Sequence, residues 1–208
     1  MAIALKTASD LVNPDSNKFD KSVLIKSDGV YSTSNKILIR WALDLPESIY
    51  SCVDKSTAKI MGMYAEYVNY ILLSDRTITV VLDQDYRFTS RLLDVTWPSL
   101  DQFQFENSNI RAAYSLNSIS DKIKSFSAFN NEFIYFEDGF VNSHEGGNVR
   151  SEGFSMEFKS NIIAKYRIDD VRFACKHFDT IQSSVGKSFD YLLDSNNPDK
   201  VGVIVRVV

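Results

Sequence analysis

The sequence is poor in residues that interrupt regular structure, with 4 Pro and 8 Gly among 208 residues. It is rich in aromatic residues, with 14 Phe and 10 Tyr, which favour strands because large side chains pack well on a pleated surface. This balance predicts long β-strands rather than a loop-rich chain. The content of 44% hydrophobic and 24% charged residues is that of a folded chain with room for one large or two small domains.

Cysteine and histidine are scarce, with two of each. Cys52 and Cys175 are isolated and lack the CxxC or His-rich surroundings of a zinc site, so we expect buried, reduced thiols. His144 and His177 belong to no Ser/His/Asp arrangement and no metal-ligand spacing, so we expect surface histidines. We therefore predict no enzymatic activity, no metal site and no cofactor.

The sequence also lacks a long apolar run. The first six residues are too short a stretch for a signal peptide, and no segment approaches the length of a membrane span. We therefore expect a soluble, cytoplasmic protein that makes no membrane contact. The net charge of -4 argues against nucleic acid covering the whole surface, although a local basic patch remains compatible with it.

Two hydrophobic periods alternate along the chain and predict its elements. A period of two predicts strands at residues 3–5, 36–45, 70–73, 77–82, from 86, 149–163, 189–193 and 201–208, and hairpins at 21–33 and 132–143. A period near four predicts helices around residues 8–12 and at 54–68, 116–126 and 168–181. In the first hairpin, Asp28-Gly29 is expected to supply the positive φ angles of a tight turn.

The order of these elements repeats. The pairs Asp28-Gly29 and Asp138-Gly139 lie 110 residues apart, and the helices that begin near residues 54 and 168 have nearly the same offset. We infer an internal duplication, in which each copy holds two strand-rich units with one helix apiece.

A segment in the middle of the chain carries a family resemblance. It reads Phe88-Thr89-Ser90-Arg91-Leu92-Leu93-Asp94 and continues to Trp97-Pro98. This resembles the end of the middle domain of bacterial DNA polymerase sliding clamps, Phe-x-Ser-Arg/Lys-Leu-Ile/Val-Asp-Gly-x-Phe-Pro. The sequence departs from that pattern at Val95, where the family has Gly, and at Trp97, where it has Phe. The last strand is similar to the family's apolar-Pro-Met-Arg ending, with Arg206 but without the Pro and Met.

The resemblance implies an α+β fold of two duplicated DNA-clamp domains, with helices lining one face and β-sheets outside. The first domain is expected to span residues 1–105, with a connector at about 95–105, and the second residues 106–208. Bacterial clamps have three such domains and close as dimers, whereas two-domain phage and eukaryotic clamps close as trimers. The chain is therefore expected to form a homotrimeric ring of the phage type.

The resemblance also implies two binding surfaces. A sliding ring attracts phosphates without reading bases, so it needs cations on the helices that face the hole. The candidates occur as pairs on predicted helices, with the first and last pairs expected to be equivalent: Lys55 and Lys59, Lys122 and Lys124, Arg172 and Lys176. A partner-peptide pocket between the domains is expected to be lined by Pro98, Phe103, Val201, Val203 and Val205.

The implied function is that of a sliding clamp, a processivity factor that encircles duplex DNA and tethers a replicative DNA polymerase. Its expected partners are double-stranded DNA, bound without sequence preference, the polymerase and a clamp loader. Two alternatives remain open. One is a clamp-like factor that acts in phage late transcription through RNA polymerase, and the other is a virion or assembly protein that binds no DNA.

Overall fold

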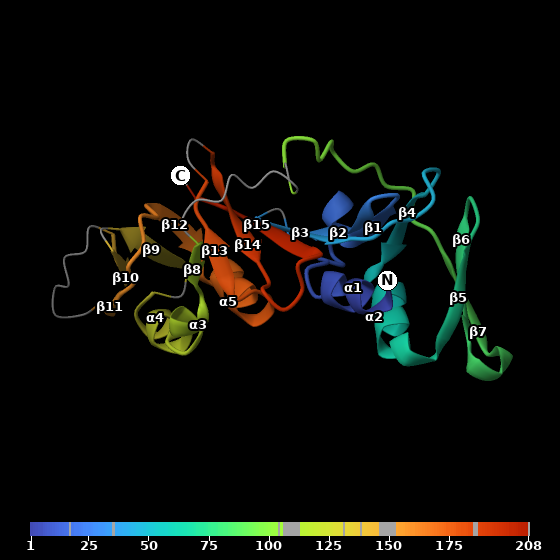
Figure 1. The fold of residues 1–208 in the computed structure, drawn as a ribbon, viewed down its shortest axis with the longest axis horizontal. Coiled ribbons are helices and arrows are strands. Elements are labelled where there is room, and N and C mark those ends of the chain that lie inside the picture. The colour runs from blue at the N-terminus through green and yellow to red at the C-terminus, as the bar shows by residue number, and fades with distance from the viewer. Residues whose placement is uncertain are drawn as a thin grey trace. The chain divides into compact units, whose positions relative to one another are not determined.

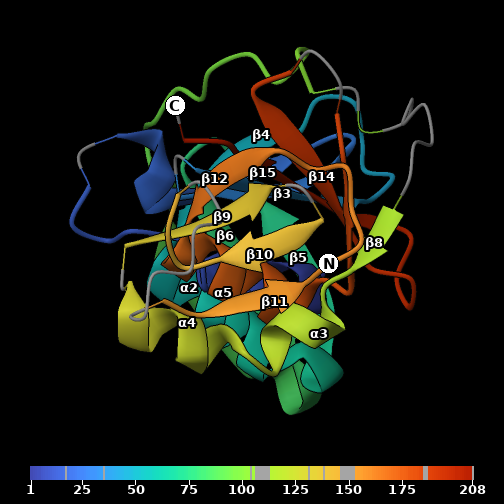
Figure 2. The same ribbon diagram turned by 90° about the vertical axis from the view of Figure 1, so that its left-hand side faces the viewer.

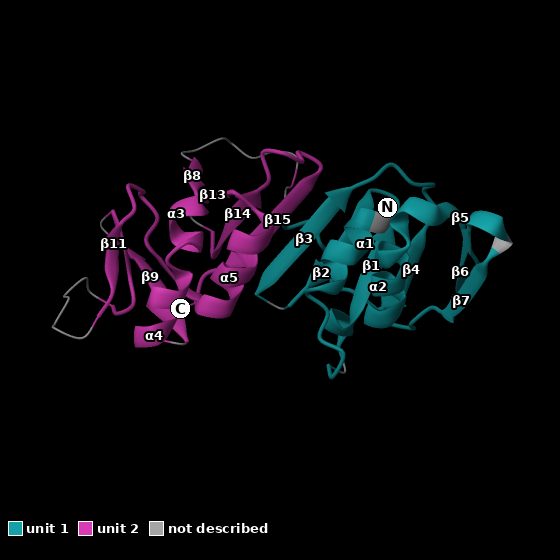
Figure 3. Ribbon diagram, turned by 90° about the horizontal axis from the view of Figure 1, so that it is seen from below, with its two compact units in different colours: residues 1–103 teal, residues 104–208 magenta. Residues whose placement is uncertain are grey.

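The structure is a computed structural model, and it divides into two compact units, residues 1–103 and 104–208 (Figure 3). The residues that it describes are 1–16, 18–34, 36–103, 105, 113–130, 132–137, 139–145, 153–184 and 187–207. The expected domain boundary, after residue 105, is followed by residues 106–112, which lie outside the described part of the chain.

Unit 1 is built from two consecutive motifs, each with a helix followed by three antiparallel strands (Figure 1). The first motif consists of α1 (Ala2–Ser9), β1 (Ser22–Lys26), β2 (Gly29–Thr33) and β3 (Ile37–Ala42). The second begins with a strand of its own and consists of β4 (Tyr50–Asp54), α2 (Lys55–Met63), β5 (Val68–Leu73), β6 (Thr77–Leu82) and β7 (Arg87–Arg91).

Unit 2 repeats this plan. Its first motif consists of β8 (Ala113–Ser115), α3 (Asn117–Ser120), α4 (Ile123–Phe129), β9 (Phe133–Glu137), β10 (Phe140–Asn142) and β11 (Ser155–Glu157). Its second consists of β12 (Ala164–Arg167), α5 (Ile168–His177), β13 (Thr180–Gln182), β14 (Phe189–Leu193) and β15 (Lys200–Val205). Figure 2 shows α3 and α4 on one side of the strands β9, β10 and β11. The predicted mixed fold, with two strand-rich motifs in each copy, is confirmed.

The two motifs of a unit exchange strands. The strand that leads into the helix of one motif pairs antiparallel with the first of the three strands of the other motif. This holds for β4 with β1, for β8 with β13 and for β12 with β9. Three of the four motifs therefore have a sheet that is extended by a strand of the other motif.

The N-terminal helix corrects the predicted strand at residues 3–5. Ala4, Leu5 and Ala8 are each 1% exposed or less, and their spacing of one and then three residues is helical. Helix α1 lies against α2 so closely that a Cβ on Gly62 would come within 2.3 Å of the Lys6 Cβ. A three-residue apolar run could not distinguish this short buried helix from a strand.

The helices predicted at 54–68 and 168–181 form but end earlier than expected, the one predicted at 116–126 runs on to Phe129, and in place of the one predicted around 8–12 helix α1 ends at Ser9. Helix α2 is capped by Asp54, whose carboxylate accepts a hydrogen bond from the Thr57 backbone N–H at 2.9 Å. Ala58 and Met61 form its buried stripe as predicted, both at 0% exposure, whereas Ala65 and Val68 lie beyond its last residue. The predicted helix at 116–126 is the pair α3 and α4, and the helix predicted at 168–181 ends at His177 because β13 follows.

The first hairpin forms, but its turn differs from the predicted one. Lys26 pairs with Gly29, so the turn residues are Ser27 and Asp28, and of these residues only Gly29 has a positive φ, of 154°. A Cβ on Gly29 would lie 2.3 Å from the Trp41 carbonyl oxygen of β3. Glycine is therefore needed to let the neighbouring strand approach. In the second hairpin Gly139 has a φ of 80°, and Asp138 lies outside the described residues.

The core of unit 2 is aromatic. The rings of Phe136 and Tyr166 meet edge to face with their centroids 5.2 Å apart. The rings of Phe136 and Phe158 do the same at a centroid distance of 5.5 Å. Phe136 and Tyr166 are 1% exposed or less. Burial of one such side chain contributes roughly 1.5–3 kcal/mol, and edge-to-face contact adds about 0.5–1.5 kcal/mol. This contact links β9 to β12 and so joins the two motifs of the unit.

We predict that Gly29→Ala destabilises the protein more than Gly139→Ala. Both substitutions put a side chain on a residue with positive φ, but a Cβ on Gly139 meets no atom within 4 Å, so that variant should lose only about 1 kcal/mol. Gly29→Ala must also displace β3 and should lose about 1–3 kcal/mol more. Urea unfolding of the two variants checks this, and equal losses would show that β3 yields without cost.

Candidate functional site

The candidate DNA-binding surface consists of the cations on the helices. Lys59 on α2 is exposed, and so are Lys122 and Lys124 at the start of α4. Lys55 is different, because it is half-buried and its Nζ donates a hydrogen bond at 3.0 Å to the Val12 carbonyl oxygen. Lys55 therefore fastens α2 to the segment that follows α1, which leaves it less available to a ligand than Lys59.

Helix α5 carries the other predicted pair. Arg172 and Lys176 are both exposed. The Arg172 guanidinium contacts the Asp169 carboxylate at 2.5 Å and donates to Ser127 Oγ of α4 at 2.7 Å. Arg172 thus joins two helices of unit 2 while about half of its side chain remains exposed, at 49%.

The predicted pairs on α2 and α5 match at one position only. Helices α2 and α5 match when their first residues, Lys55 and Ile168, are superposed, because the buried Ala58 and Met61 then fall on Val171 and Ala174. In that register Arg172 corresponds to Lys59, one turn away from the expected match with Lys55. Lys55 instead corresponds to the buried Ile168 and Lys176 to the exposed Met63. One cationic position is therefore shared by the two helices.

The segment after β7 runs beside β4. The backbone N–H of Leu93 donates to the Cys52 carbonyl oxygen at 2.8 Å. Trp97 is 6% exposed, and its indole N–H donates to Ser22 Oγ at 2.9 Å while its ring packs on Phe19 at 5.4 Å. Trp97 therefore anchors the connector to β1, and an aromatic residue at this place has a structural role in unit 1.

The predicted pocket residues lie in different units. In unit 1, Pro98 is exposed and Phe103 is half-buried. In unit 2, Val201, Val203 and Val205 alternate along one face of β15, and Val203 has no exposed surface.

The opposite face of β15 is turned towards α5. A Cβ on Gly202 would lie 2.7 Å from the ring of Phe178, directly after that helix. The three valines consequently lie on the side of the sheet away from the helices, where their β14 neighbours are Leu193, Tyr191 and Phe189. The face is apolar along its whole length.

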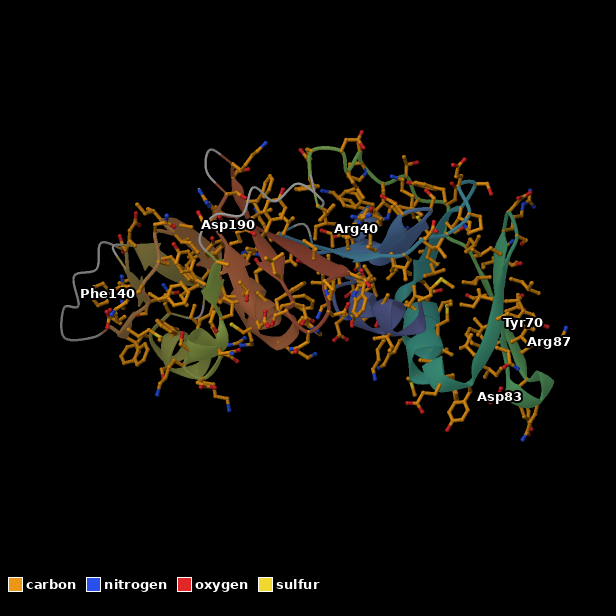
Figure 4. The ribbon with its side chains drawn as sticks, viewed as in Figure 1. Arg40, Tyr70, Asp83, Arg87, Phe140 and Asp190 are labelled. Atoms are coloured by element: carbon orange, nitrogen blue, oxygen red, sulfur yellow. The ribbon has the colours of Figure 1, made fainter. Side chains whose placement is uncertain are left out.

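A buried ionic cluster in unit 2 was not predicted from the sequence. Arg206 binds the Asp190 carboxylate with two nitrogens, Nε at 2.7 Å and Nη2 at 2.5 Å, and Asp190 is fully buried. The Tyr166 hydroxyl and the Ser184 backbone N–H also donate to this carboxylate. Burial, followed by the nearby Asp190 charge, raises the pKa of Tyr166 well above its usual range. Asp190 lies on β14, as Figure 4 shows, so the cluster joins β12, β14 and the chain after β15.

The described residues hold no group of three His, Cys, Asp or Glu side chains able to hold a metal ion. Cys52 and Cys175 are both free thiols. Burial raises the pKa of Cys52 to about 11 and that of Cys175 to about 12, so neither forms a reactive thiolate near neutral pH. His144 is exposed as expected, whereas His177 is half-buried and packs on the Phe173 ring at 4.4 Å.

None of the helices in the described ranges is long and apolar enough to cross a membrane. No protein-family model matches the chain, and no curated protein matches it in sequence.

Solved structures of bacterial clamps match the chain in fold over essentially its whole length. The Helicobacter pylori beta clamp bound to a DNA ligase peptide matches with a TM-score of 0.74 at 13% identity, covering 100% of this chain and 63% of the clamp. The DNA polymerase III subunit beta of Pseudomonas aeruginosa matches with a TM-score of 0.76 at 10% identity, covering 99% and 63%. The Bartonella birtlesii DnaN sliding clamp bound to griselimycin matches with a TM-score of 0.75 at 12% identity, covering 100% and 63%.

The chain therefore has the fold of a DNA sliding clamp. The bacterial beta clamp is the particular form that it matches, and the chain spans about 63% of the length of those clamps. The resemblance seen in residues 88–98 is confirmed at the level of fold.

We predict that Arg206→Ala costs far more stability than Arg172→Ala. The first variant leaves the buried Asp190 carboxylate without its cation, which typically costs about 3–5 kcal/mol. The second removes a half-exposed partner of Asp169, for which less than about 1 kcal/mol is expected. Urea denaturation measures both, and similar losses would mean that the cluster around Asp190 is not the main ionic support of unit 2.

Proposed function

We propose that the protein is a sliding clamp, a ring without enzymatic activity that encircles duplex DNA and tethers a replicative DNA polymerase. The observation that carries this proposal is the fold match to bacterial beta clamps over 99–100% of the chain. A fold alone does not fix a function, so the proposal also needs a closed ring, a surface for DNA and a surface for partners.

The ring is proposed to contain three copies. The chain has two compact units and spans about 63% of the beta clamps that it matches. If those clamps close as dimers of three-domain chains, as the family resemblance implies, three copies of this chain supply the same number of domains. A head-to-tail contact that closes gives a ring with one kind of interface.

Charge complementarity favours β7 of one copy and β11 of the next as the strands that meet. Arg87 and Arg91 are exposed on β7, an edge strand of unit 1. Glu157 is exposed on β11, an edge strand of unit 2, where it lies beside the exposed Phe140. Opposite charges on facing strands steer association and fix the register. Lys159, 3.5 Å from Glu157, is an exposed partner that an arginine of the next copy can replace.

DNA is proposed to contact the helix side of each unit through Lys59, Lys122, Lys124, Arg172 and Lys176. Repetition around a trimer triples each position, which reconciles a net charge of -4 per chain with attraction to phosphates. Lys55 is retained as a contributor to the positive potential, although its ammonium group is already bonded to Val12.

A DNA polymerase, and a clamp loader, are proposed to dock a peptide at the apolar face that carries Val201, Val203 and Val205, together with Pro98 and Phe103. Among the matched structures, the Helicobacter pylori clamp is bound to a DNA ligase peptide. The half-buried Val201 and Val205, with Tyr191 and Phe189 on the neighbouring strand, offer the kind of apolar surface on which short peptides bury their anchor side chains.

We predict that changing Lys59 and Arg172 together to Glu weakens retention on DNA while leaving assembly intact. The double variant should dissociate from nicked circular plasmid at a lower salt concentration than the unaltered protein. Its affinity should also depend less steeply on salt concentration, because fewer counterions are released when it binds. Lys187→Glu, a charge reversal on an exposed residue outside the helices and outside β7 and β11, is the matched control and should bind like the unaltered protein. Salt titration of plasmid retention measures all three.

Linear DNA tests the ring itself. A protein that encircles DNA should be retained on nicked circles and slide off the same plasmid once it is cut. Equal retention on both forms would contradict the sliding-clamp proposal.

We predict that Arg87→Glu and Glu157→Arg each dissociate the ring and that the two changes in one chain restore it. Each single change creates like charges at every interface, whereas the double change exchanges their positions. Light scattering across a dilution series should give three times 23.6 kDa for the unaltered and doubly changed proteins and a lower mass for each single variant. Failure of the double variant to recover would show that β7 and β11 do not meet.

A further inference from the structure

Strand β5 lacks a neighbour that the internal repeat supplies elsewhere. In three places a lone strand that leads into a helix pairs with the first strand of the other motif, as β4 does with β1, β8 with β13 and β12 with β9. The fourth such place lies beside β5, before α1. Among the residues that the structure describes, β5 pairs with β6 and with no other strand, and the sheet order is β5-β6-β7.

Burial shows that this edge is open. Four of the five residues of β1 are buried, and β9 and β13 each have two buried residues, whereas none of the six residues of β5 is buried. On the face turned to the core, Val80 and Ile78 of β6 are 0% exposed, but their β5 partners Ile71 and Leu73 are only half-buried. The core thus extends through β6 and stops short at β5.

The open edge is also uncharged. Its sequence, Val68-Asn69-Tyr70-Ile71-Leu72-Leu73, contains no Lys, Asp, Glu, Arg or Pro, the residues that usually protect an edge strand from pairing. On the outer face Tyr70 is 48% and Leu72 54% exposed. Figure 4 shows Tyr70 and Arg87 on the face of this sheet that is turned away from α2, in agreement with their shared pairing to Val81.

We propose that β5 binds an extended peptide of a partner protein, which adds a fourth strand antiparallel to β5. This proposal does not depend on the ring or on DNA. The three strands that fill the equivalent places are three to five residues long, and the irregularity between Val68 and Tyr70 leaves residues 70–73 as a regular edge of matching length. The peptide is thus a short uncharged segment, bound through its main chain.

The filling strands indicate which side chains the peptide carries. Each of them has an apolar or aromatic residue at a position that is buried, or half-buried in β8: Cys52 and Val53 in β4, Tyr114 in β8 and Tyr166 in β12. The half-buried Ile71 and Leu73 would receive such a side chain. The free edges β7 and β11 of a second copy carry Arg87, Arg91 and Glu157, which suit this apolar edge poorly, so a peptide fits better than another copy.

The test uses the full chain labelled with ¹⁵N and a capped hexapeptide that alternates Thr with Val or Tyr. The amide chemical shifts of residues 70–73 and of their β6 partners should change on addition of the peptide. The changes should saturate at a peptide concentration below about 1 mM, since weaker binding is not distinguishable from non-specific contact. Two forms of the peptide, N-methylated on alternate residues, separate main-chain pairing from apolar contact. One form should fail to bind and the other should bind normally, because a strand offers its N–H groups to each side in turn.

Leu72→Lys is the test variant and Thr89→Lys its matched control. Both residues pair with Thr79 and share one face, but Leu72 is on the open edge and Thr89 on β7. Leu72→Lys should lower the affinity for the peptide at least about tenfold, and Thr89→Lys should change that affinity less than about twofold. Equal binding of both N-methylated peptides, shifts elsewhere in the chain, or no shift would overturn the proposal.

A fusion removes the dependence on affinity. The same hexapeptide placed directly before Met1 occupies the position that β4 and β12 hold before their helices, at high effective concentration. It should raise Tm and slow amide exchange at residues 70–73 relative to a Gly-Ser segment of equal length, and no difference would overturn the proposal. Two results together would instead show that β5 pairs with a second copy. They are protection of the β5 amides from exchange without any peptide, and a lower solution mass of the Leu72→Lys variant.

Discussion

The exchange of lone strands between motifs is the constraint on which each unit depends. β4 belongs to the second motif in chain order but completes the sheet of the first, and β12 completes the sheet of β9 in the same way. A further strand extends the apolar face on which a small sheet depends for its stability, so a motif that receives a lone strand gains stability from the other motif. Because β4 continues into α2 and β12 into α5, the same pairing fixes where each helix begins. The positions of the helix cations therefore follow from strand pairing.

The electrostatics of those helices favour a weak and distributed attraction for phosphate. Helix α5 has Asp169 and Asp170 in its first turn and Lys176 in its last, an order that complements the helix dipole. The same order places Asp169 against Arg172, so a phosphate must compete with an existing partner for that guanidinium. Half-exposed pairs of this kind are worth less than about 1 kcal/mol. Such a contact is easily exchanged, as the proposed movement along DNA without sequence readout requires.

The sequence predicted most accurately where a long buried stripe marked a helix. The spacing of Ile168, Val171, Cys175 and Phe178 predicts the buried side of the last helix. Ile168 and Val171 are buried on α5, Phe178 is buried directly after the helix ends, and Cys175 is half-buried. It failed for the lone strands β4, β8 and β12, which have three to five residues and no extended alternation. Matching the helices by their charges instead of their buried residues shifted the expected equivalence by one turn. The cluster of Arg206, Asp190 and Tyr166 could not be predicted from the sequence, because its members come from separate strands that only the folded sheet brings together.

The chain shares its fold with clamps to which it is only 10–13% identical, so the fold tolerates many different sequences. Its units need alternating strands, short buried helices and lone strands that bridge the motifs, and many apolar residues satisfy these requirements. Specific residues are needed only at a few places, such as Gly29 beneath β3 and Arg206 beside Asp190. The open edge of β5 is the one described place where the repeat is incomplete and the core is not covered. A local departure from an otherwise consistent pattern is where a binding function is expected, because the fold alone gives no reason to leave apolar backbone unpaired.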